Sequence, residues 1–110
     1  SIPWQAPEIF TGALQTAESD LWSLGVVLWE ILTGSVPWAG KTEAEICELV
    51  TVARQQLGVN DAARLGAPPG YIEAMHSCWI FESPRRPTVT QVLDSMQSRV
   101  AEWPEDFLPG

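Results

Sequence analysis

Residues 18–34 constrain the fold most, because as a helix this stretch is apolar around nearly its whole circumference. Within residues 21–32 only Ser23, Gly25 and Glu30 interrupt the apolar run. A helix without a wide polar face belongs at the centre of a fold, so we expect it to be buried on most sides. It is too short and too charged to cross a membrane.

Residues that can cap a helix stand at both ends of this central helix. Ser19 or Asp20 can accept hydrogen bonds from the free amides of the first turn, and Gly34 can adopt the left-handed conformation that ends a helix. Asp20 has a second interpretation, because a carboxylate at the mouth of a buried helix can also hold a neighbouring loop through hydrogen bonds. On local sequence alone, the simple cap is favoured.

Further helices are predicted on either side of a weakly patterned segment, and the chain contains no convincing strand. Capping boxes at Thr42 and Thr88, completed by Glu45 and Gln91, each precede an apolar stripe at helical spacing. Another helix is expected over about residues 71–79, whereas residues 55–66 are expected to form a loop with one turn at most. The last helix should bury one side, formed by Val89, Val92, Leu93, Met96 and Val100.

The first ten residues are predicted to form a loop that leads into one short helical turn, because Pro3 and Pro7 each lack an amide donor. Glu8 stands between Pro7 and two apolar residues. It is either an exposed acid beside a buried pair or a buried acid that needs a partner. The residues themselves leave both alternatives open.

Length and charge restrict the classes of partner. A chain of 110 residues can form one domain or part of one. Its formal charge of -8 disfavours direct binding to nucleic acid or to an anionic membrane surface. Cys47 and Cys78 are expected to be reduced, packed thiols. Because the sequence opens at Ser1 without an initiating Met and closes on Pro109 and Gly110, we expect it to be part of a longer protein.

Catalytic and metal-binding patterns are absent from the sequence. No nucleophile stands with a base, and there is no glycine-rich phosphate loop, C-x-x-C or H-E-x-x-H motif. His76 has no second histidine or acid at ligand spacing, so it is interpreted as an ordinary helix residue. We therefore expect this chain to bind no metal or cofactor by itself.

Four short motifs nevertheless occur in an informative order: Ala6-Pro7-Glu8, Ser19-Asp20 with Trp22 and Gly25, Cys78-Trp79, and Arg86-Pro87. In this order and at this spacing they resemble the second half of the C-terminal lobe of a eukaryotic protein kinase. The resemblance implies an all-α fold with helices packed around one central buried helix. It also implies a partial kinase domain over residues 1–101 and a C-terminal tail over residues 102–110.

The resemblance implies roles for nine residues. Glu8 would form a buried ion pair with Arg86 that closes the activation segment, and Asp20, with Trp22, would support the catalytic loop. This favours the loop-holding interpretation of Asp20 over the simple cap. Val27 and Ile31 would support the hydrophobic stack below the nucleotide. The wall that receives a substrate residue would be formed by Ile2, Pro3 and Trp4.

The groups that transfer phosphate in this family are not in the sequence. A kinase needs a glycine-rich loop, a phosphate-binding lysine, an H-R-D loop and a D-F-G motif, and all four precede the A-P-E motif. Asp106-Phe107 does not supply the last, because Leu108 replaces its glycine and the pair lies at the wrong end. ATP and Mg²⁺ are therefore expected in the parent protein only.

Two functions remain open. The parent is either an active kinase that phosphorylates proteins, or a pseudokinase or helical protein-binding module without catalysis. Pro3 and the Leu32-Thr33-Gly34 stretch resemble the tyrosine-kinase-like group, which favours serine or threonine over tyrosine as acceptor, whereas Gln5 departs from the usual pattern. The expected partners are a protein substrate and the rest of the kinase domain. The expected location is the cytoplasm, including the cytoplasmic part of a membrane receptor kinase.

Overall fold

The computed structural model describes residues 2–107, and each regular element in that range is helical, as predicted. The α-helices are α1 (Pro7–Phe10), α2 (Ala17–Thr33), α3 (Glu43–Thr51), α4 (Asp61–Gly66), α5 (Tyr71–Ser77) and α6 (Val89–Gln97). Short 3-10 turns complete the chain: η1 (Ile2–Trp4), η2 (Ser83–Arg85), η3 (Val100–Glu102) and η4 (Glu105–Phe107). Residues 108–110 of the predicted tail lie outside the described residues.

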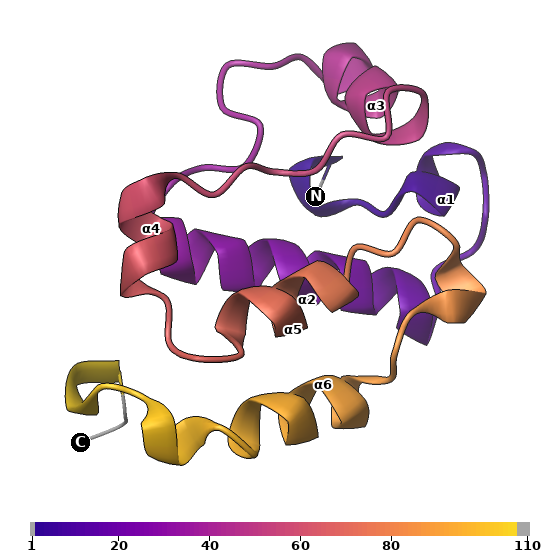
Figure 1. Cartoon of the computed structure of the whole chain (residues 1–110). Coiled ribbons are helices and arrows are strands. Elements are labelled where there is room, and N and C mark those ends of the chain that lie inside the picture. The colour runs from indigo at the N-terminus through magenta and orange to yellow at the C-terminus, as the bar shows by residue number, and fades with distance from the viewer. Residues whose placement is uncertain (1, 108–110) are drawn as a thin grey trace.

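Helix α2 runs through the middle of the fold, with α5 alongside it, α6 beyond α5, and α1 and α3 on the opposite side (Figure 1). Its inward side contributes Leu21, Trp22, Val26 and Trp29 to a single core. The largest fully buried side chain of that core is Trp79, in the turn that follows α5. The prediction of a central helix is therefore confirmed.

The start of α2 differs from the prediction. Its N-cap is Thr16, whose hydroxyl accepts a hydrogen bond from the Ser19 amide, while the Ser19 hydroxyl accepts one from the Thr16 amide. Ser19 thus completes a capping box from inside the helix, and Asp20 lies beyond the cap. The predicted end is confirmed, because Gly34 is left-handed, with φ of 65°.

Two apolar surfaces are open to solvent, and the one on the last helix was predicted to be buried. On α2, Val27 is 41% exposed and Ile31 64% exposed, so one side of this otherwise covered helix is open. On the predicted inner side of α6 only Val92 is buried, and Met96 is partly buried. The other members remain exposed, because no described residue covers them: Val89, Leu93 and Val100.

The smaller elements match the predictions in part. Both predicted capping boxes, at Thr42 and Thr88, are present. Residues 55–66 contain more helix than expected, because the Asn60 side chain caps α4 by accepting a hydrogen bond from the Ala63 amide at 2.8 Å. Helix α5 ends at Ser77, two residues before its predicted limit. The two cysteines are free, and Cys78 is fully buried.

Candidate functional site

Arg86 and Glu8 are joined by two parallel hydrogen bonds although they lie 78 residues apart. Arg86 Nη1 donates to Glu8 Oε2 at 2.7 Å, and Nη2 donates to Oε1 at 2.8 Å. The same guanidinium donates to the backbone carbonyls of Glu18, Ile80 and Phe81. Because the Arg86 side chain is 0% exposed, these contacts satisfy a charge that is completely removed from water.

The carboxyl side of this pair is kept ionised. Burial of Glu8 by itself would raise its pKa, but the hydrogen bonds and the positive charge of Arg86 outweigh burial, and the pKa lies below the usual value. The Arg86 guanidinium also lies 5.1 Å from the centre of the Trp22 ring, which meets the Phe81 ring edge-on at 5.4 Å. Glu8 is therefore a partnered acid, not an acid free in solvent.

Asp20 lies in the first turn of α2 and is exposed. Its Oδ1 accepts a hydrogen bond from Gln15 Nε2 at 2.6 Å, and it takes no part in the cap of its helix. Trp22, two residues later, points into the core and is 4% exposed. The two residues predicted to support the catalytic loop thus lie on different sides of α2, one accessible and one buried.

The predicted wall residues form the turn η1, and all three are partly buried: Ile2, Pro3 and Trp4. Trp4 is fixed to α2 by both of its polar groups. Its indole Nε1 donates to Glu30 Oε1 at 2.5 Å, and its carbonyl accepts from the Ser23 hydroxyl at 2.7 Å. A groove of about 240 Å³ lies beside it, lined by Trp4, Gln5, Ala6, Ile9, Gln15 and Ser23.

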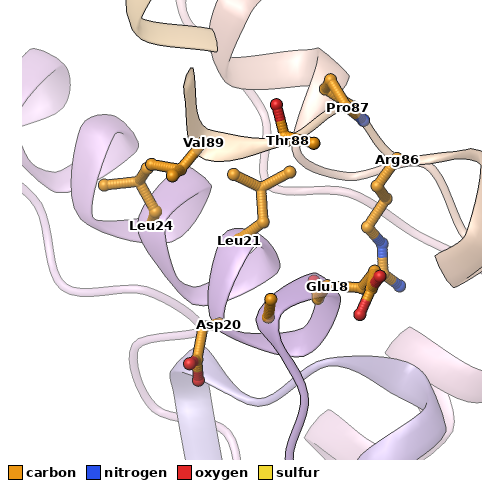
Figure 2. A pocket seen from close by; sticks show the side chains of 9 residues that line it. Glu18, Asp20, Leu21, Leu24, Arg86, Pro87, Thr88 and Val89 are labelled. Carbon is orange, nitrogen blue, oxygen red and sulfur yellow. The ribbon is translucent and has the colours of Figure 1, made fainter. Parts of the chain in front are cut away.

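The exposed side of α2 continues into a larger groove of about 370 Å³ at the start of α6. In Figure 2 the side chains of Leu21, Leu24 and Val89 gather between the two helices, while the Asp20 carboxylate points away from them. Val27 and Ile31 follow Leu24 along the same helix at helical spacing. The predicted stack residues therefore lie on the same side of α2 as Leu24, which lines this groove.

Two residues with clear structural roles, Glu30 and Ser23, were not predicted as site residues. Their only signal was that each interrupts the apolar run of the central helix. A polar side chain at such a position requires a partner once it leaves water. That requirement predicts a partner, but it cannot identify Trp4, which lies 26 residues before Glu30.

The described residues contain neither a cluster of potential metal ligands nor a membrane-spanning helix. Nowhere within residues 2–107 do three or more His, Cys, Asp or Glu side chains meet as potential metal ligands. None of the helices described is long and apolar enough to cross a membrane.

Comparison with known sequences gives one family. The model described as protein tyrosine and serine/threonine kinase matches residues 1–96. The chain is 33% identical over 99 residues to human mitogen-activated protein kinase kinase kinase 11. It is 35% identical over 100 residues to insulin receptor-related protein of Cavia porcellus. It is also 30% identical over 104 residues to a putative serine/threonine-protein kinase/receptor of Acanthamoeba polyphaga mimivirus.

These matches cover most of this chain but little of each relative. They include 90% of the chain for the human and Cavia porcellus proteins and 93% for the mimivirus protein. The corresponding shares of the relatives are 11%, 7% and 6%.

Proposed function

Because this chain belongs to the protein tyrosine and serine/threonine kinase family, we propose that it forms the substrate-side part of a kinase C-terminal lobe. The whole protein would transfer the γ-phosphoryl group of ATP to serine or threonine side chains of proteins, with tyrosine as the second choice. The observation that best supports this proposal is the Glu8–Arg86 pair, which joins the A-P-E motif to the late Arg-Pro turn.

The open side of α2 suits the proposed support of the catalytic loop. Asp20 presents an exposed carboxylate that points away from the neighbouring apolar groove, and a carboxylate can accept hydrogen bonds from loop amides. Val27 and Ile31 offer the apolar surface on which further parts of the lobe could pack. Trp22 would act indirectly, by holding the start of α2 against the Glu8–Arg86 pair.

The nucleotide and metal sites of the proposed kinase would lie outside these residues. The described residues offer no ligand set for Mg²⁺, so ATP and Mg²⁺ would be held by other parts of the protein, and no step of the transfer is assigned to this chain. Protein substrates would approach the wall formed by Ile2, Pro3 and Trp4. The proposed location is the cytoplasm or the cytoplasmic side of a receptor.

The test is a transfer assay with radiolabelled ATP, Mg²⁺ and a generic protein substrate, followed by analysis of the phosphorylated amino acids. The full-length protein should yield phosphoserine or phosphothreonine. The 110 residues alone should transfer nothing, because the groups that position and stabilise the phosphoryl group are not among them. Full-length protein with Glu8→Gln should lose activity more than protein with Glu48→Gln, the same change on the exposed part of α3.

Each other outcome has a distinct meaning. Phosphotyrosine alone would overturn the choice of acceptor but not the kinase function. A full-length protein that folds, yet transfers no phosphate to any substrate, would favour a pseudokinase or a protein-binding module. Micromolar affinity of the isolated chain for ATP would contradict the absence of a nucleotide site from these residues.

A further inference from the structure

Trp4 is held to the central helix at both of its polar ends, which is more than its packing requires. Its indole N–H is bound to Glu30 and its carbonyl to Ser23, and these residues lie seven positions apart on α2. Seven positions correspond to about two helical turns, so both groups face the same side of α2. Together they form a two-point clamp on the segment that contains η1.

The clamp fixes the rim of a groove. Trp4 and Ser23 both line the groove of about 240 Å³, which is also bordered by two neutral amide side chains, Gln5 and Gln15. If Trp4 were free to rotate, this groove would lose one side. Glu30 itself does not line the groove, so its effect on anything bound there would be transmitted through Trp4.

We propose that Glu30 is a positioning residue, which shapes this groove for a substrate peptide by fixing the Trp4 indole. The inference rests on the proposed function, because it takes the groove as the wall that meets a peptide. A carboxylate suits this task well, since a charged acceptor gives a shorter and stronger hydrogen bond than a neutral one. The Ser23 hydroxyl holds the backbone of the same residue and prevents the turn from sliding along α2.

The first arm of the test measures the clamp itself. Nitrogen-15 labelling of the six tryptophan indoles lets solvent exchange of each N–H be followed by NMR, and Trp4→Phe identifies the Trp4 signal. Glu30→Ala should accelerate exchange of the Trp4 indole roughly 10- to 100-fold, the loss expected for a hydrogen bond to a charged acceptor. Glu30→Gln, which keeps an acceptor oxygen, should restore most of the protection, and Glu48→Ala on the exposed surface of α3 should change nothing.

The second arm measures peptide recognition. The labelled 110-residue chain is applied to an array of serine- and threonine-containing peptides, randomised at each flanking position in turn. Wild type should prefer particular residues at one position. Glu30→Ala and Trp4→Phe should each reduce that preference by about tenfold, whereas Glu30→Gln and Glu48→Ala should keep it.

Two results would overturn the inference. One is an unchanged peptide preference in Glu30→Ala and Trp4→Phe, or no preference in wild type. The other is unchanged exchange of the Trp4 indole in Glu30→Ala. Because binding to the array requires no phosphoryl transfer, an inactive full-length protein with a Glu30-dependent preference would reject only the proposed kinase activity.

Discussion

The two sides of α2 are completed in different ways. On the inner side, Trp22 and Val26 are at most 4% exposed. Every N–H group of the adjacent Arg86 guanidinium donates a hydrogen bond to Glu8 or to a backbone carbonyl. On the outer side, Val27 and Ile31 are 41% and 64% exposed although they are equally apolar. Apolar character therefore indicates which surfaces need covering, but not which part of a protein covers them.

Of the substitutions on the inner side of α2, Arg86→Ala should destabilise the fold most. It would leave the Glu8 carboxylate, whose side chain is 20% exposed, without its partner, and we expect a loss of about 3–5 kcal/mol in the free energy of unfolding. Arg85→Ala is the matched control, because Arg85 is exposed, and should cost no more than about 0.5 kcal/mol. Chemical denaturation measures both variants, and equal losses would mean that the pair contributes nothing special.

Gly25→Ala tests how tightly the same side is packed. A Cβ atom at position 25 would lie 2.6 Å from Trp79 Nε1 and 2.7 Å from Cys78 Cβ, so α2 and the turn after α5 would have to separate. We expect a loss of about 1–3 kcal/mol, measured as a lower thermal midpoint. Gly66→Ala has open space around it and should be neutral, or stabilising by up to about 1 kcal/mol. A harmless Gly25→Ala would show that this contact can relax.

Low pH should reduce the stability of the fold by protonating Glu8. Its pKa in the folded chain lies below the ordinary value of 4.5, because Arg86 outweighs the opposing effect of burial. The unfolded chain therefore binds the proton more readily than the folded chain. The stabilisation that the pair gives is complete above pH 4.5 and is lost as pH falls through the pKa of the folded chain. When denaturation is measured from pH 7 to pH 3, the free energies of unfolding of wild type and Glu8→Gln should converge. A constant difference in their stability would contradict the assignment.

Ile31→Ala, on the outer side of α2, should have the smallest effect on stability. Since Ile31 is largely exposed, we expect a change within about 0.5 kcal/mol in the free energy of unfolding, measured by chemical denaturation. Ile46→Ala makes the same substitution at a residue that is 3% exposed and should cost about 2–5 kcal/mol. Similar losses at the two positions would mean that the outer side of α2 is covered in solution.

Local signals predicted local structure well. Gly34 ends α2, and Thr42 and Thr88 start α3 and α6, because one side chain decides each boundary. The start of α2 was predicted wrongly, since several neighbouring residues can serve as a cap there and their choice depends on where the preceding loop runs. Asn60 and α4 were missed because a six-residue helix has too little periodicity to detect.

Contacts distant in sequence were harder to predict. Joining Glu8 to Arg86 required the resemblance to a family, because an isolated acid indicates the need for a partner but not its identity. The bond between Trp4 and Glu30 had no such precedent and was missed. The exposed side of α6 was predicted as buried, because periodicity identifies an apolar side without showing what packs on it.

The distance between Glu8 and Arg86 along the chain also has a consequence for biosynthesis. The ribosome adds about 5–20 residues per second, so the 78 residues that separate the two charges take roughly 4–16 s to make. Helix α2 is synthesised within that interval, before the arginine that will secure its first turn exists. The nascent chain thus displays both sides of its most apolar helix, which is the period when chaperones would be most useful to it.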